Sequence, residues 1–307
     1  MNDPADEIIA TLAQRARDAA PLDAAALPDA RLELIDALAR LFDTQESGAP
    51  AACLGPLLPG ATFVGGARVP GSALELEPSQ AAWCIAWLAG DAYLGGLLPL
   101  ADYLARRAVL NGARAPKLAW LLEAVAQARA LAGSLRIPAP AHEAPVLESC
   151  AARVAIAATA SRLLGASVVE AEAAVSLAFA EGLAPLDSSD AGTRARSCAA
   201  AAASGVRTAL FARAGAPGLP RIVSSRPGGF EASLLGGGRM TLDAPDPSPL
   251  VARARPDPLL VWHRFGEAVR RRFKPRQAER LLASIHAEAP LEAMPLQTFV
   301  AALVRPG

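Results

Sequence analysis

Two arginines that directly precede an alanine-rich segment are the first candidates for chemistry. Arg194 and Arg196 stand in a stretch from Pro185 to Pro220 that reads PLDSSDAGTRARSCAAAAASGVRTALFARAGAPGLP. Its Asp, Ser and Gly residues predict a polar loop leading into a helix that begins near Ser197. Two guanidinium groups and the free amides of a first helical turn could converge there on an anion. The same spacing also fits two solvated loop arginines, so both interpretations stay open.

Groups suited to proton transfer are few. Asp91 lies in an apolar segment, where burial could make its carboxylate a base, although an exposed aspartate at a helix end fits equally well. The histidines, at positions 142, 263 and 286, fit surface or packing roles, and the two lysines, at 117 and 274, lack the setting that amine chemistry needs. The sequence has no Gly-x-Ser-x-Gly, phosphate-loop or His-Glu-x-x-His motif.

The four cysteines predict neither a metal centre nor a disulfide framework. They stand at positions 53, 84, 150 and 198, far apart and without a Cys-x-x-Cys pair. We expect reduced thiols in the core, and neither a metal nor a cofactor.

The composition is that of a globular chain without a bias toward polyanions. Its 307 residues include 30 basic and 30 acidic ones, and 52% are hydrophobic, which is enough for a substantial core. With zero net charge, no field of the whole chain attracts it to nucleic acid or to anionic lipid. The short basic run at 270–274 fits a solvated helix end.

The most apolar window, Trp83 to Leu104, raises the question of a membrane span. Asp91, Asp102 and three glycines interrupt it, so a buried pair of helices is expected and no membrane partner. The N-terminal segment carries acidic residues where a secretion signal needs basic ones, which predicts a cytoplasmic protein.

Apolar periodicity predicts a mostly α bundle. The helix after Ser197 closes on Gly215 and Pro217, and its small side chains let neighbouring helices approach, so we expect it to be central. A first helix starts after Asp3 and Pro4, and an irregular loop with short extended pieces spans 43–78. Further helices are expected at 31–42, 79–89, 94–110, 116–132, 145–164 and 167–181, and two or three more after residue 258.

Several segments resemble the MmgE/PrpD family. The similar motifs keep the family's order over nearly the whole chain, and they include LGPLLPG, GGARVPG, LGGLLPLADYLARR, LLEAVAQARALAG, GTRARSCAAAAASGVRTALFARAG and LEAMP. The C-terminal stretch that begins PLLVWHRF is similar to the end of the 2-methylcitrate dehydratases within this family, which are hydro-lyases of propionate breakdown. The resemblance implies an all-α main domain formed by both ends of the chain, usually dimeric, and a smaller α+β domain inserted before the last helices.

We expect that inserted domain to be largely missing here. Beyond Pro220, Gly and Pro density forbids regular helix. The predicted organisation is a helical domain at 1–231, a Gly/Pro-rich linker at 232–258 in place of the small domain, and C-terminal helices at 259–307 that pack back on the helical domain.

Most site residues that the resemblance implies differ in this chain. After Trp87 and Leu88 the family has a loop with a histidine, whereas this chain runs from AGDAY directly to Leu94. Asp91 is a candidate for the family aspartate, but the shortening makes that alignment ambiguous. The other departures are Gln127 and Arg129 in place of Lys and His, Glu148 in place of another His, and Ala195 in place of Lys; Arg153 replaces a lysine, and Arg194 matches.

These departures favour a relative that binds rather than catalyses. Dehydration needs one group that takes the α-proton and another that protonates the leaving hydroxyl, and both candidates are lost. Five arginines could still hold a di- or tricarboxylate through charge-assisted bonds, namely Arg129, Arg153, Arg194, Arg196 and Arg207. The hypothesis is a catalytically degenerate protein that binds a carboxylate, or that pairs with itself or with a full-length paralogue.

Two alternatives stay open. One is an active hydro-lyase, isomerase or epimerase on a small polycarboxylic acid, with Asp91 as base and the arginines as clamps. The other is a gene product without a selected role.

Overall fold

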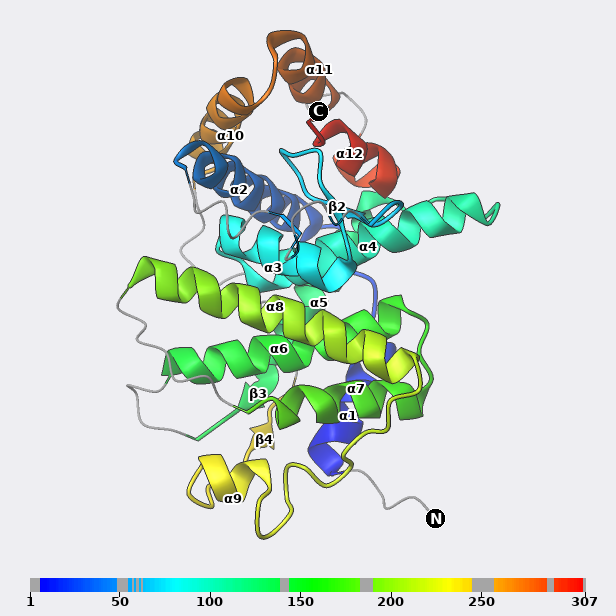
Figure 1. Ribbon diagram of the computed structural model, residues 1–307, viewed down its shortest axis with the longest axis vertical. Helices are drawn as coiled ribbons and strands as arrows, with labels where there is room; N and C mark the ends of the chain where they lie inside the picture. The colour runs from blue at the N-terminus through cyan, green and yellow to red at the C-terminus, as the bar shows by residue number, and fades with distance from the viewer. Residues whose placement is uncertain are drawn as a thin grey trace.

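α-Helices form nearly all of the regular structure (Figure 1). This computed structural model describes residues 6–48, 55, 56, 58, 61, 63–138, 144–182, 190–244, 257–285 and 290–305. The helices are α1 (Glu7–Arg17), α2 (Leu27–Glu46), α3 (Pro78–Ala89), α4 (Ala92–Leu110), α5 (Leu118–Ser134), α6 (Ala144–Leu163), α7 (Val168–Ala180), α8 (Ala191–Arg213), α9 (Phe230–Leu234), α10 (Pro258–Arg272), α11 (Pro275–Ile285) and α12 (Leu296–Ala302), with a 3₁₀ turn η4 (Leu291–Ala293). The all-α prediction is confirmed.

The strands are two short antiparallel pairs. β1 (Ala67–Arg68) pairs with β2 (Glu75–Leu76), and β3 (Leu135–Arg136) pairs with β4 (Thr241–Leu242). The first pair is the kind of short extended piece that the Gly- and Pro-rich loop predicted. The second pair joins the segment after α9 to the end of α5. Its backbone hydrogen bonds satisfy amide and carbonyl groups of both segments.

Helix α8 is central, as predicted, but it begins earlier than expected. It packs against α3, α4, α6 and α7, and Ala199, Ala202 and Val206 are fully buried along it. The start at Ser197 is wrong: the carboxylate of Asp190 accepts the Thr193 amide at 2.8 Å, and this cap starts the helix at Ala191. Arg194 and Arg196 therefore belong to the helix and not to a loop before it.

The apolar window folds as the expected pair of packed helices, α3 and α4. Gly90 ends α3 in the left-handed conformation (φ 62°), and Asp91 begins α4 directly after it. Gly95 then lets α4 approach α3, since a Cβ there would lie 2.6 Å from the backbone nitrogen of Ala86. Among the described residues, each helix is too short or too polar to span a bilayer.

Other helix boundaries follow the predictions with local shifts. α2 extends from Leu27 to Glu46, so it occupies the start of the predicted loop at 43–78. α1 begins at Glu7 after Asp6, while Asp3 and Pro4 lie outside the described residues. Beyond Pro220 the expectation of no regular helix is wrong for α9, whose Phe230 packs edge-on against Phe179 at 5.4 Å. That aromatic contact stabilises a short helix despite the surrounding glycines.

The last helices pack on elements from the first half of the chain. α10 lies along α2, where Phe265 and Phe273 contact Phe42, and α12 packs against α4 and α5. The basic run at the end of α10 is more than a solvated helix end: Arg271 pairs with Asp43 at 2.7 Å and Arg272 with Glu46 at 2.8 Å. These ion pairs join α10 to α2.

A buried ion pair connects β1, α4 and α12. Asp102 on α4 is fully buried, and it accepts the Arg68 backbone amide at 3.2 Å and the Arg68 Nε at 3.0 Å. The same guanidinium donates to the Gln297 carbonyl at 2.8 Å. Every charged group of the pair thus has bonds, which is what burial of ions requires.

Candidate functional site

Asp91 lies at the junction of α3 and α4 with both carboxylate oxygens engaged. Its Oδ1 accepts the backbone amides of Tyr93 at 3.0 Å and Leu94 at 3.1 Å, so it caps α4. Its Oδ2 accepts from Arg129 at 2.6 Å. The residue is only 5% exposed, which resolves the two sequence interpretations: Asp91 is a helix-end aspartate, and it is buried.

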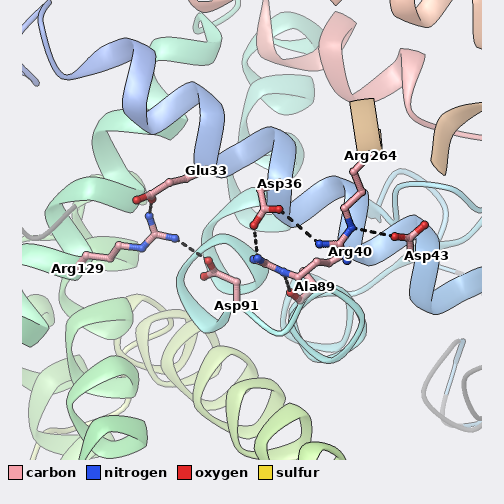
Figure 2. Close-up of polar contacts among 8 residues, drawn as sticks. All are labelled: Glu33, Asp36, Arg40, Asp43, Ala89, Asp91, Arg129 and Arg264. Atoms are coloured by element: carbon pink, nitrogen blue, oxygen red, sulfur yellow. Dashed lines mark hydrogen bonds and ion pairs between the residues drawn. The ribbon is translucent and has the colours of Figure 1, made fainter. Parts of the chain in front are cut away.

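Arg129 joins Asp91 to a carboxylate that the sequence did not reveal. Figure 2 shows its guanidinium between Asp91 and Glu33 on α2, with ion pairs to both. It also lies 5.6 Å from the centroid of the Tyr93 ring, within the range of a cation–π contact. Glu33 was missed because it looks like any solvated glutamate on an amphipathic helix, and only tertiary packing brings it to Arg129.

The charged groups continue along α2 (Figure 2). Arg40 pairs with Asp36 and donates to the carbonyl of Ala89, the last residue of α3, at 2.8 Å. Arg264 on α10 donates to Asp43 at 3.1 Å. The α3–α4 junction is therefore fixed from two sides, by Arg40 at its carbonyl end and by Arg129 at Asp91.

The space beside Arg129 is small. A cavity lined by Glu33, Leu34, Leu94, Leu122 and Arg129, among others, has a free volume of about 10 Å³. That is on the order of one water molecule. A tricarboxylate does not fit in this cavity while the ion pairs are closed.

Two further positions singled out by the resemblance make bonds within the fold. Gln127 donates to the carbonyls of Arg15 and Ala16 at the end of α1. Arg153, which is 7% exposed, donates to the Ala178 carbonyl at 2.8 Å and to that of Gly182, and so caps the end of α7. Burial raises the pKa of the neighbouring Cys150 thiol, although the charge and hydrogen bond of Arg153 oppose this.

Arg207 on α8 pairs with Glu181 at 2.7 Å, at the same end of α7. Burial by itself would raise the pKa of Glu181, but the hydrogen bond from Arg207 and the charges of Arg207 and Arg153 outweigh it and lower that pKa. Of these two arginines, Arg207 pairs with a carboxylate of the protein itself, and Arg153 donates to backbone carbonyls at the same end of α7.

The shifted pKa of Glu181 predicts a pH-dependent contribution to stability. A lowered folded-state pKa stabilises the fold above the unfolded value of about 4.3, and this contribution is lost as pH falls through the folded-state pKa. Glu181→Gln is expected to lower the free energy of unfolding by up to about 1 kcal/mol at pH 7, because the pair is partly solvated. Urea unfolding at pH 7 and at the lowest pH where the protein stays folded checks this.

The matched control is Glu148→Gln, since Glu148 is exposed and makes no side-chain bond within the described residues. It should leave stability unchanged at both pH values. If Glu181→Gln lowered the free energy of unfolding equally at both pH values, the electrostatic explanation would be contradicted.

Arg194 and Arg196 are exposed on the first turns of α8. In the part of the chain that the structure describes, neither side chain has an ion-pair or hydrogen-bond partner. The amides of this helix end are not all free, because Asp190 accepts the Thr193 amide and hydroxyl. The sequence-predicted arginines therefore do not form one cluster. Arg129 pairs with Asp91, Arg207 pairs with Glu181, and Arg153 donates to backbone carbonyls at the end of α7. Arg194 and Arg196 face solvent.

Other candidate groups are dispersed. His263 is exposed on α10, and His142 and His286 lie outside the described residues. Cys84 and Cys150 are buried as predicted, Cys198 is half-buried, and Cys53 lies outside the description. No group of three or more His, Cys, Asp or Glu residues suited to a metal occurs within the described ranges.

The chain is similar to proteins of one known family. The model of the MmgE/PrpD N-terminal domain matches residues 7–243. The 2-methylcitrate dehydratase of Escherichia coli strain K12 is 31% identical over 217 residues, which cover 64% of this chain and 45% of the relative. That of Cupriavidus necator is 30% identical over 221 residues, 66% and 46% of the two chains, and the mitochondrial one of Yarrowia lipolytica is 27% identical over 262 residues, 78% and 50%. The chain spans about half the length of the curated relatives it matches.

Proposed function

The chain belongs to the MmgE/PrpD family, and from this premise we propose that it is a catalytically inactive member that binds a small di- or tricarboxylate. Its relatives are named 2-methylcitrate dehydratases, so 2-methylcitrate and its close analogues are the first ligands to consider. The proposal places the protein in the cytoplasm, near the metabolism of propionate.

One observation supports the proposed loss of catalysis: the groups best suited to acid–base chemistry already make bonds within the fold. Asp91 accepts two backbone amides and Arg129, and Arg129 is shared with Glu33. A general base must reach the proton that it abstracts, directly or through one water. For Asp91 to do so, it would have to give up either the α4 cap or its bond to Arg129.

The exposed arginines support carboxylate binding at the start of α8. Arg194 and Arg196 follow a helix end that already holds one carboxylate, that of Asp190. Positive charge and amide donors make such a position favourable for anions. Arg129 and Arg153 contribute less to this proposal, because their guanidinium groups already have internal acceptors.

The test is thermal unfolding with and without millimolar 2-methylcitrate, citrate or cis-aconitate. A ligand present at about one hundred times its dissociation constant is expected to add about 2.7 kcal/mol of stability. Arg194→Gln/Arg196→Gln should abolish this shift. Arg221→Gln/Arg239→Gln is the charge-matched control, because both residues are exposed elsewhere on the chain, and it should retain the shift.

The absence of any shift with all three acids would contradict carboxylate binding. In that case we would propose instead that the protein pairs with itself or with a full-length 2-methylcitrate dehydratase. Light scattering of the protein alone, and of an equimolar mixture with that enzyme, distinguishes these two partners by mass.

A second candidate function is an active hydro-lyase, isomerase or epimerase with Asp91 as base. The specific observation in its favour is the burial of Asp91 beside Arg129, a cation that could hold a substrate carboxylate once the ion pairs open. Turnover of 2-methylcitrate or citrate that Asp91→Asn abolishes, in a variant that remains folded, would establish the enzyme. Such turnover would also overturn the inactive assignment.

A further inference from the structure

The last turns of α4 project beyond the neighbouring helices (Figure 1). Val109 is 40% exposed and Leu110 77% exposed, and residues 109–114 are all exposed. Neither side chain belongs to the buried core. Exposed apolar groups gathered in one place mark contact sites for proteins or membranes.

A second apolar element lies against α4 about one helical turn before this end. The turn from Phe63 to Gly66 is closed by the Gly66 amide, which donates to the Phe63 carbonyl at 2.7 Å, and it presents Val64 at 92% exposure. Arg106 on α4 holds the turn by donating to the Gly66 carbonyl at 2.7 Å and by pairing with Glu75 at 2.9 Å. Leu110 lies one helical turn beyond Arg106, so it stands on the same side of α4 as this turn.

Backbone hydrogen bonds define the conformation of the projecting segment. Gly112 (φ 75°) reverses the chain, and the Ala113 amide donates to the Ala108 carbonyl at 2.8 Å. The segment that returns to α5 is fixed in turn, because the Leu118 amide donates to the Met294 carbonyl at 2.8 Å. The exposure of Leu110 therefore reflects a defined conformation and not a frayed helix end.

Positive charges lie near Val109 and Leu110 along the chain. Arg107, Arg114 and Lys117 are exposed, and none has an ion-pair partner in the described ranges. The sequence contains no Asp or Glu between Asp102 and Glu123. We call this surface the α4 tip, made of Phe63, Val64, Arg107, Val109, Leu110, Arg114 and Lys117.

The positive charge of the α4 tip indicates which kind of partner binds there. A symmetric second copy would bring the same cations of both chains together, and like charges oppose such a contact. A specific protein interface takes roughly 20–30 residues from each side, more than this convex tip offers. A membrane needs less, because a few aliphatic side chains enter the headgroup region while adjacent Lys and Arg attract anionic lipids.

We propose that the α4 tip docks the protein peripherally on an anionic membrane surface, which departs from the sequence-based expectation of no membrane partner. Val64, Val109 and Leu110 enter the lipid interface, and Arg107, Arg114 and Lys117 contact the lipid phosphates. The neutral chain has no attraction as a whole, so the docking depends on these local charges. No residue of the tip is used in the proposed carboxylate site, and either proposal can fail without the other.

Sedimentation with vesicles tests the docking. One set contains phosphatidylglycerol and phosphatidylcholine in equal parts, and the other contains phosphatidylcholine alone. The full chain should bind the anionic set. The triple variant Arg107→Gln/Arg114→Gln/Lys117→Gln should weaken that binding roughly 100-fold, because each cation contributes a factor of about five. High salt should weaken it as well, since exposed charges are screened.

Matched variants separate the α4 tip from general charge and hydrophobicity. Val64→Ser/Leu110→Ser should lose most of the binding, whereas Leu259→Ser/Leu260→Ser, at exposed leucines of α10, should retain it. Lys274→Gln/Arg276→Gln/Arg280→Gln removes three exposed cations of the α11 region and should also retain it. Absence of binding to anionic vesicles, or equal losses in tip and control variants, would overturn the proposal. Binding of poly-glutamate in place of vesicles would also overturn it and would indicate an acidic protein partner.

Discussion

Replacing Asp102 by alanine is expected to lower the free energy of unfolding by about 3–5 kcal/mol. The variant leaves the Arg68 guanidinium, whose side chain is 12% exposed, without its counter-ion in the core. It also removes the acceptor of the Arg68 backbone amide. Because a buried cation without a partner costs more than the pair contributes, this single change weakens the contact between β1, α4 and α12. Urea unfolding followed by circular dichroism measures the loss.

An exposed ion pair of similar geometry provides the comparison. Arg136 and Asp243 approach to 2.6 Å, but their side chains are 64% and 53% exposed. Asp243→Ala should therefore cost less than about 1 kcal/mol. The double variant Arg68→Met/Asp102→Leu should be more stable than Asp102→Ala, since it buries no unpaired charge. If Asp102→Ala and Asp243→Ala lowered the free energy of unfolding equally, burial would not determine how much each ion pair contributes to stability.

Gly95→Ala is expected to destabilise the protein by about 1–3 kcal/mol, although alanine favours helices. The added Cβ would meet the backbone of Ala86, which cannot move aside as a flexible side chain can. The crossing of α3 and α4 would have to widen, and Asp91 lies at the junction of these two helices. Thermal unfolding measures the change.

Gly133→Ala is the matched control for this substitution. Gly133 also lies in a helix, α5, but a Cβ there meets nothing within 4 Å. We expect a stabilisation of about 0.5–1 kcal/mol at that position, because alanine loses less backbone entropy on folding. A gain at both positions would mean that the α3–α4 contact is looser than the structure indicates.

The carboxylate site and the α4 tip are tested by different experiments. The first depends on Arg194 and Arg196, with thermal shift as its measure, and the second on Arg107, Arg114 and Lys117, with vesicle binding as its measure. The two sets lie on different helices and can be varied independently. A protein with both properties would bring a bound carboxylate to a membrane surface.

Local chemistry allowed much of the fold to be predicted from the sequence. The 3.6-residue periodicity, together with Gly and Pro at the boundaries, placed α3 to α7 within a few residues, because these signals act within one or two turns. The small residues of α8 predicted its central position, because small side chains let neighbouring helices pack closely against it. The family resemblance also lay in contiguous motifs, and the match over residues 7–243 confirms it.

The tertiary structure decided what each charged residue does. Arg129, Arg153 and Arg194 are alike in sequence, but one pairs with Asp91 and Glu33, one caps α7, and one faces solvent. The start of α8 also depended on a geometric choice, since Asp190, Ser197 and several neighbours can all cap a helix. Ion pairs and caps join residues that are distant along the chain, and their energy depends on burial and distance. Only the packed helices determine these two quantities.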